Sequence, residues 1–164
     1  MSTNQPDVRH SGIVDVDFGL GVVITEPVNL YGCKIGDGVS IGPFVEIQSS
    51  VSVGARTKVQ SHTFICTCVM IGADCFIGHG VMFVNDKFSD GSPAGGDRTR
   101  WLSTSIADRV SIGSNATILP VKICSDVVVG AGAVVTKDIL ISGTYIGNPA
   151  RLLKVQNKMN QEVS

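Results

Sequence analysis

Residues that favour α-helices are scarce in this chain of 164 residues, which contains only 3 Glu, 7 Leu and 8 Ala. Val and Ile, which are stiff at χ1 and favour strands, number 23 and 15. A helical bundle is therefore excluded. A disordered polar chain is excluded as well, because 43% of the residues are hydrophobic.

Excess charge and long apolar runs are also missing. The formal net charge is -1 and 16% of the residues are charged, so no surplus of positive charge attracts nucleic acid. No apolar run approaches the length of a membrane-spanning helix, and residues 1–10 lack the apolar region of a secretory signal. We therefore expect a cytoplasmic protein that binds neither nucleic acid nor membranes.

The cysteines fit neither a disulfide framework nor a zinc knuckle. They are odd in number, and the spacing of Cys66 and Cys68 is too tight for a normal zinc site. We expect most of them to be small buried side chains in a reducing compartment. The five are Cys33, Cys66, Cys68, Cys75 and Cys124.

A six-residue repeat runs without a gap from position 35 to position 82. Its first positions are all Ile or Val, which by chance has a probability of about 10⁻⁵: Ile35, Ile41, Ile47, Val53, Val59, Ile65, Ile71 and Ile77. The second position is Gly at 36, 42, 54, 72 and 78. A period of six fits neither a helix nor simple strand alternation. It predicts a short strand and a tight turn, three times per coil, with the first position in the core and the Gly serving the turn.

The repeat continues through two interruptions and makes one domain of residues 1–164. The repeats make about six coils, and because stacked coils lie ~4.8 Å apart the prism is about 30 Å tall. A one-residue slip follows Leu119-Pro120. Later first positions are Ile106, Ile112, Ile118, Ile123, Val129, Val135 and Ile141.

A twenty-residue excursion, residues 86–105, separates the two parts of the repeat. It contains three Gly, one Pro and the only Trp of the chain. A long loop ejected from a regular solenoid is usually functional, because the scaffold does not need it. The alternative is a tolerated disordered insertion, against which Trp101 argues, since an aromatic side chain usually packs on something.

Two C-terminal segments, VGAGAVVTKDI and YIGNPARLLKV, together with the hexads, resemble the hexapeptide-repeat acyltransferases over about residues 12–154. The resemblance implies an all-β fold, a left-handed parallel β-helix, with a short helix in the C-terminal tail 151–164. A right-handed β-helix is the alternative. The resemblance also implies a homotrimer whose active sites lie between subunits, with the loop of one subunit covering the next.

The same resemblance implies that acetyl-CoA is the co-substrate. Bare backbone amides at Gly130, Ala131, Gly132 and Ala133 would let the pantetheine arm approach closely. Lys137 and Arg151 would meet its phosphates.

The segment FIGHGVMFVND, Phe76 to Asp86, resembles the nucleotide-linked 3-amino-sugar N-acetyltransferases, as do NLYGC, GPFVEIQ and SHTFIC. This likeness implies acetyl transfer from acetyl-CoA to the amino group of a nucleotide-linked amino-deoxyhexose for surface-polysaccharide synthesis, with a 3-amino group favoured over a 4-amino group. In that family the Asn that matches Asn85 touches the acceptor amine. One departure is that Leu119-Pro120 lacks the usual following Gly.

The remaining candidate residues are assigned by side-chain chemistry. His79 is either a general base or a hydrogen-bonding turn residue, and Asp86 either holds the amine or is a solvated loop residue. Arg98 and Arg100 are candidate clamps for a pyrophosphate, and Trp101 or Tyr31 would stack on the base. Polar or aromatic groups for the acceptor are Asn29, Tyr31, Glu46, Gln48 and His62.

Three other functions stay open at this point. An O-acetyltransferase on a simple sugar, serine or xenobiotic would need a true base at His79. A γ-class carbonic anhydrase would need three zinc ligands, but Val84 stands where a third His would follow His62 and His79, so we expect no metal. A non-catalytic solenoid scaffold would not bind acetyl-CoA.

Overall fold

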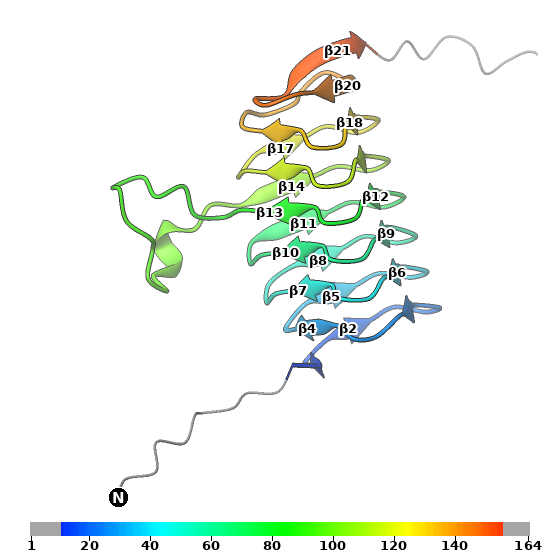
Figure 1. Ribbon diagram of the computed structural model, residues 1–164. Helices are drawn as coiled ribbons and strands as arrows, with labels where there is room; N and C mark the ends of the chain where they lie inside the picture. Colours follow the sequence, from blue (N-terminus) through cyan, green and yellow to red (C-terminus); the bar gives the residue numbers. More distant parts are fainter. Residues whose placement is uncertain (1–10, 156–164) are drawn as a thin grey trace, which may run out of the picture.

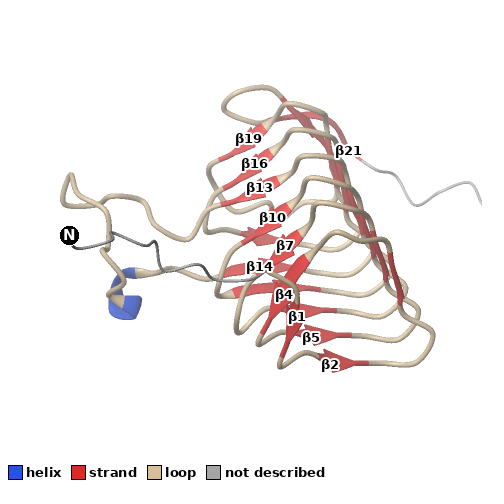
Figure 2. Ribbon diagram, turned by 60° about the horizontal axis from the view of Figure 1, so that its bottom comes forward, coloured by secondary structure: helices blue, strands red, loops and turns tan. Residues whose placement is uncertain are grey.

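The computed structural model describes residues 11–155, which form one stack of coils around a narrow core (Figures 1 and 2). Each regular coil contributes one strand to each of three sheets, and these strands pair in parallel with strands of the neighbouring coils; only β21 of the described residues pairs antiparallel. This is the left-handed parallel β-helix that the sequence predicts. No helix in residues 11–155 is long and apolar enough to cross a membrane.

We call the three sheets A, B and C. Sheet A contains β1 (Ile13–Val14), β4 (Asn29–Tyr31), β7 (Glu46–Ile47), β10 (Phe64–Ile65), β13 (Met82–Phe83), β16 (Thr117–Ile118) and β19 (Val134–Val135). Sheet B contains β2 (Asp17–Phe18), β5 (Lys34–Ile35), β8 (Ser52–Val53), β11 (Val69–Ile71), β14 (Thr104–Ile106) and β17 (Lys122–Ile123). Sheet C contains β3 (Val23–Ile24), β6 (Ser40–Ile41), β9 (Lys58–Val59), β12 (Phe76–Ile77), β15 (Ser111–Ile112), β18 (Val128–Val129), β20 (Gly143–Ile146) and β21 (Arg151–Val155).

The core is filled by the first positions of the hexads, as predicted, and also by the fifth positions. No side chain at these positions between 35 and 81 is more than 4% exposed. Two fifth positions are threonines, and their hydroxyl groups remain satisfied because Thr57 donates to the carbonyl of Gly72 and Thr63 to that of Gly78. Side chains therefore alternate between core and surface, and the surface positions of neighbouring coils stand above one another.

The second-position glycines serve a different purpose from the one predicted. Their backbone is not left-handed; instead, a Cβ added at Gly54 would lie 2.4 Å from the carbonyl carbon of Gly72 in the next coil. The left-handed conformation falls two positions later, at Gly38, Phe44, Ser50, Arg56, His62, Cys68, Asp74 and Gly80. Glycine at position two is thus required by the close approach of coils, and the turn itself accepts larger residues.

The loop leaves the stack between β13 and β14 without disturbing the register. Ile71 of β11 pairs with Ile106 of β14, so the coil above the loop continues directly on the coil below. Residues 104 and 105, expected in the loop, belong to β14. The loop projects away from the coils in both views and contains one short 3-10 helix, η1 (Arg98–Arg100).

The C-terminal end differs from the prediction. Residues 151–155, expected to begin a short helix, form β21, which pairs antiparallel with β20 and covers the open edge of sheet C. The rest of the predicted tail, residues 156–164, lies outside the described residues. In the last turn Ile139 is buried at 3% exposed, whereas Ile141, predicted to face the core, is 58% exposed.

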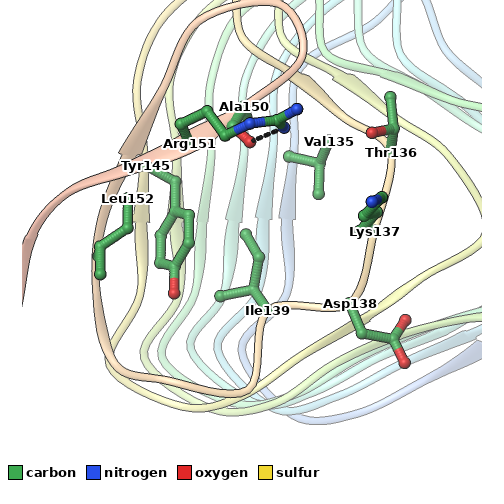
Figure 3. A pocket seen from close by; sticks show the side chains of 9 residues that line it. All are labelled: Val135, Thr136, Lys137, Asp138, Ile139, Tyr145, Ala150, Arg151 and Leu152. Carbon is green, nitrogen blue, oxygen red and sulfur yellow. Dashed lines mark hydrogen bonds between the residues drawn. The ribbon is translucent and has the colours of Figure 1, made fainter.

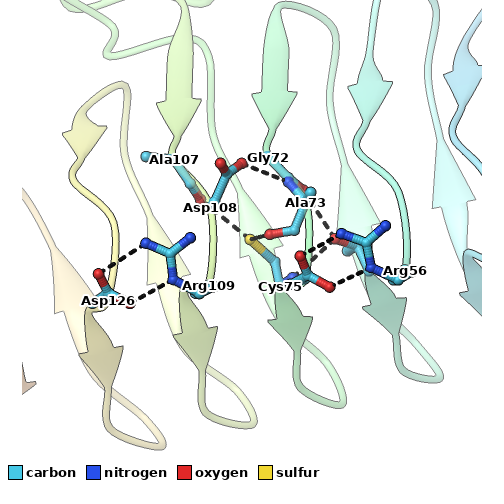
Figure 4. A network of polar contacts seen from close by, with 10 residues as sticks. Arg56, Gly72, Ala73, Cys75, Ala107, Asp108, Arg109 and Asp126 are labelled. Atoms are coloured by element: carbon cyan, nitrogen blue, oxygen red, sulfur yellow. Dashed lines mark hydrogen bonds and ion pairs between the residues drawn. The ribbon is translucent and has the colours of Figure 1, made fainter.

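The turns that join sheet B to sheet C carry a column of alternating charges (Figure 4). Arg56 pairs with Asp74 one coil away, and Arg109 pairs with Asp126 in the same manner, each through two nitrogen–oxygen contacts. Asp108 accepts a hydrogen bond from the backbone N–H of Ala73 at 2.8 Å. These groups neutralise one another, so this corner of the helix is a structural one.

Candidate functional site

Three of the predicted acceptor residues form one hydrogen-bonded strip on sheet A. The side-chain amide of Asn29 in β4 donates to one carboxylate oxygen of Glu46 in β7 at 3.2 Å. The amide of Gln48, which follows β7, donates to the other oxygen at 3.0 Å. Burial, and then the negative charge of Glu46, raise the pKa of Tyr31, which follows Asn29 on the same edge.

The strip continues around the corner between sheets A and B to the predicted catalytic residue Asn85. The side-chain oxygen of Gln48 accepts from both the backbone N–H and the hydroxyl of Thr67, at 3.2 and 3.3 Å. The carbonyl of Thr67 in turn accepts from the side-chain amide of Asn85 at 3.1 Å. Asn85 also closes the neck of the loop, because its own carbonyl accepts from the N–H of Leu102 at 2.9 Å. The structure thus brings four predicted residues together at the base of the loop.

His79 lies at a different corner, in the turn between sheets C and A. Its Nδ1 is 2.9 Å from the hydroxyl of Ser61 in the coil below. When Nδ1 carries the proton and donates to Ser61, Nε2 keeps a lone pair that can accept a proton from a substrate. His62, also predicted to bind the acceptor, stacks on Phe44 with ring centroids 4.8 Å apart at this same corner.

His79 and Asn85 therefore do not converge within one chain. Both occupy the third position of successive hexads, and the strand β13 of sheet A lies between them. The two turns lie at opposite ends of β13, so the two side chains stand at separate corners of the prism, one side apart.

The charged loop residues mainly organise the loop. Asp86 accepts from the N–H groups of Ala94 at 2.6 Å and Phe88 at 2.9 Å, and these hydrogen bonds lower its pKa. Arg100 pairs with Asp90 and also donates to two loop carbonyls.

The other two loop residues predicted to contact substrate lie against each other. The guanidinium carbon of Arg98 is 5.9 Å from the ring centre of Trp101, a cation–π distance. Trp101 is half-buried, as its predicted packing requires, and its partner is the loop's own arginine.

A cavity of about 280 Å³ lies at the C-terminal end of the stack (Figure 3). Two predicted cofactor residues line it, Lys137 in the turn after β19 and Arg151 at the start of β21. Apolar groups of Ile139, Tyr145 and Leu152 complete its wall. Two cations beside an apolar surface suit a ligand that combines phosphates with a hydrophobic part.

The glycine-rich segment before β19 is more tied to the fold than predicted. The N–H groups of Gly130, Gly132 and Ala133 donate to backbone carbonyls of the chain, so these amides are not bare. Ala133 is buried in the core and presents no side chain to a ligand. Gly132, with a left-handed backbone and open space around it, and the exposed Ala131 remain the accessible positions.

Thr67 and Ser61 contact the candidate residues but were not predicted from the sequence. Each lies 18 residues before a candidate catalytic residue, Asn85 and His79, which is the length of one coil. That spacing was the available signal, because a coil places such residues in vertical contact. Within residues 11–155, no three His, Cys, Asp or Glu side chains come together in a way that would hold a metal ion.

Comparison with known proteins gives matches in sequence and in structure. Residues 32–67 match the family Bacterial transferase hexapeptide (six repeats), and residues 103–137 match Hexapeptide repeat of succinyl-transferase. Bifunctional protein GlmU of Prochlorococcus marinus is 31% identical over 149 residues, which cover 90% of this chain and 31% of the relative. GlmU of Streptococcus uberis is 29% identical and covers 87% and 32%. The chain thus spans about a third of the length of these curated relatives.

Two solved structures share the fold at low sequence identity. AntD, an N-acyltransferase from Bacillus cereus solved in complex with dTDP and coenzyme A, superposes with a TM-score of 0.77 at 22% identity, covering 87% of this chain and 84% of that one. Perosamine N-acetyltransferase from Caulobacter crescentus, in complex with CoA and GDP-perosamine, gives 0.61 at 24%, covering 87% and 57%. With its repeats matched on both sides of the loop, this chain is similar to the hexapeptide-repeat transferases in sequence, and it shares their fold.

Proposed function

We propose that the protein transfers an acetyl group from acetyl-CoA to the amino group of a nucleotide-linked amino-deoxyhexose, with a 3-amino sugar favoured over a 4-amino sugar, in surface-polysaccharide synthesis. The observation that carries the proposal is the continuous strip from Asn29 to Asn85 at the base of the loop. It places the side-chain amide of Asn85, which can orient an amine, beside a row of polar side chains. The likeness to AntD and perosamine N-acetyltransferase supports a nucleotide-linked acceptor.

The chemistry requires little more than positioning. A neutral amine attacks a thioester carbonyl readily when both are held in contact: the N–C bond forms, the C–S bond breaks, and the proton lost by the nitrogen passes to the departing thiolate to give the thiol of coenzyme A. Asn85 would accept a hydrogen bond from the amine and direct its lone pair toward the carbonyl. Lys137 and Arg151 would hold the phosphates of acetyl-CoA, because they line the cavity at the C-terminal end.

The proposal includes a homotrimer with sites between subunits. Its support is the separation of His79 from Asn85 by one side of the prism, together with a loop that projects away from its own coils. A loop in that position is available to cover a neighbouring subunit. The corner that carries Asn85 in one chain would then meet the corner that carries His79 in the next.

The test is a thiol-release assay with acetyl-CoA against paired UDP- and dTDP-linked 3-amino and 4-amino deoxyhexoses. Turnover of a 3-amino sugar, with 4-amino and hydroxyl analogues at least tenfold slower, supports the proposal. Asn85→Ala should lower kcat/KM at least tenfold. Turnover only with sugars that lack an amine would refute it.

An O-acetyltransferase is the second candidate. The Ser61–His79 pair favours it, because a hydroxyl acceptor, unlike an amine, must lose a proton to a base as it attacks. The polysialic-acid-specific acetyltransferase NeuO shares the fold with a TM-score of 0.54 at 22% identity, covering 90% of each chain. The hydroxyl analogues in the same assay decide between the two.

A further inference from the structure

The strip on sheet A contains side-chain amides whose two ends differ in hydrogen-bonding capacity. The NH₂ group of an amide only donates and its oxygen only accepts, whereas a carboxylate only accepts. Each amide in the strip therefore has one orientation that satisfies its neighbours and one that does not. The strip runs from Asn29 through the carboxylate of Glu46 to the side chain of Asn85.

Glu46 determines how Gln48 is oriented. Its two carboxylate oxygens face the amides of Asn29 and Gln48, at 3.2 and 3.0 Å, so the NH₂ group of Gln48 must point toward Glu46. The oxygen of Gln48 is then directed at Thr67, where it meets the backbone N–H and the hydroxyl. A reversed amide would place an oxygen against a carboxylate and an NH₂ group against a donor.

Thr67 connects Gln48 to Asn85 through hydrogen bonds. Its side chain is buried at 6% exposed, and its backbone N–H is held by Gln48 in the turn before β11. Its carbonyl is an acceptor only, so the contact at 3.1 Å fixes the NH₂ group of Asn85 toward the protein. The oxygen of Asn85 consequently faces away from Thr67.

We infer that Glu46 and Gln48 are positioning residues, which act through Thr67 to keep the side-chain oxygen of Asn85 directed at the acceptor amine. The inference rests on the proposed function for the identity of the acceptor, but the orientation of Asn85 is a property of the free protein. The inference gives Glu46 and Gln48 a role different from that of groups that touch the sugar directly. A direct contact contributes mainly to acceptor binding, whereas a positioning residue contributes mainly to kcat.

An exchange of the two residues tests the relay. In Gln48→Glu two carboxylates face each other. In Glu46→Gln the carboxylate that only accepts is replaced by an amide, so the orientation of Gln48 is no longer fixed. The double variant Glu46→Gln/Gln48→Glu restores it: the amide at 46 accepts from Asn29 and donates to the carboxylate at 48, which accepts from Thr67. Gln60→Glu, which adds a carboxylate directly after β9, in the turn between sheets C and A, is the matched control.

Two readouts are expected to move together. The side-chain NH₂ signals of Asn85, assigned in NMR spectra by their loss in Asn85→Asp, should exchange at least tenfold faster with solvent in each single variant. They should return to within about threefold of the wild-type rate in the double variant. In the acetyl-transfer assay the single variants should lose about tenfold in kcat with KM for acetyl-CoA unchanged, and the double variant should recover.

The two proposals fail separately. Unchanged Asn85 exchange in Gln48→Glu, or no recovery in the double variant, overturns the relay whatever the enzyme acts on. A rise in acceptor KM with unchanged kcat also overturns it, because Glu46 and Gln48 would then be direct sugar contacts. Absence of turnover by the wild-type protein with every amino sugar overturns the proposed function alone, since the exchange measurement needs no substrate.

Discussion

Replacement of Gly54 by alanine tests whether glycine at the second hexad position is required by space or by backbone conformation. The new Cβ would lie 2.4 Å from the carbonyl carbon of Gly72 and 2.6 Å from the N of Ala73. Relief needs a shift of about 1 Å in coils fixed ~4.8 Å apart by backbone hydrogen bonds. Overpacking of this kind costs ~1–3 kcal/mol, and we expect about 3 kcal/mol because the opposing atoms are backbone.

Two other glycines serve as controls. Gly38→Ala tests conformation alone, since its φ is +64° and the nearest atom is a flexible Arg56 carbon at 3.6 Å; a loss of ~1 kcal/mol is expected. Gly12→Ala has nothing within 4 Å and no positive φ, so it should be nearly neutral. Guanidinium unfolding followed by circular dichroism measures all three. Equal losses at Gly38 and Gly54, or a larger loss at Gly38, would refute the steric explanation.

Three further predictions concern the site. His79→Ala should lower kcat by roughly 10²–10⁴ and remove the acidic limb of the pH–rate profile if His79 is the base, whereas retention of most activity in His79→Asn would make it a turn residue. Lys137→Ala should weaken coenzyme A binding about tenfold in calorimetry, while Lys34→Ala, at the other end of the stack, should not. Equal effects of the two changes would show that the cofactor does not bind at Lys137. Hydrogen bonds lower the pKa of Asp86, so its contribution to loop order is present above the unfolded value of ~4 and is lost as the pH falls through the lower folded value. The protection factor of the Ala94 N–H, its exchange rate compared with that of an unfolded chain at the same pH, should fall in that acid range, and an undiminished protection factor at pH 2 would contradict the assignment.

The repeat made the coils predictable because burial has the same period as the sequence. Ile106, Ile112 and Ile118 returned to the core after the loop because the stack continues there in register. The prediction failed where the period ends. After Val135 the core position is filled by Ile139, four residues on, because the last turn is shorter than a hexad.

The C-terminal helix was predicted wrongly because tertiary pairing outweighed the local pattern. The segment RLLKV contains good helix formers, but β20 presents an open edge of unpaired backbone groups. Pairing with that edge satisfies them, which no property of residues 151–155 alone indicates. In the candidate site too, backbone contacts could not be predicted from residue type. Asn29, Glu46 and Gln48 were predicted from the chemistry of their side chains, whereas Thr67 was missed because its backbone carbonyl makes the contact with Asn85.

The break between β13 and β14 separates the residues that hold the stack together from the residues of the loop. Because Ile71 and Ile106 pair as if nothing lay between them, the stack does not register how many residues leave and return at this corner. Doubling the length of such a loop costs only ~0.6 kcal/mol in closure entropy. The loop at this corner can therefore be replaced by loops of different length and composition while the rest of the chain folds as before. On the proposed function, such a replacement would change which acceptor is used.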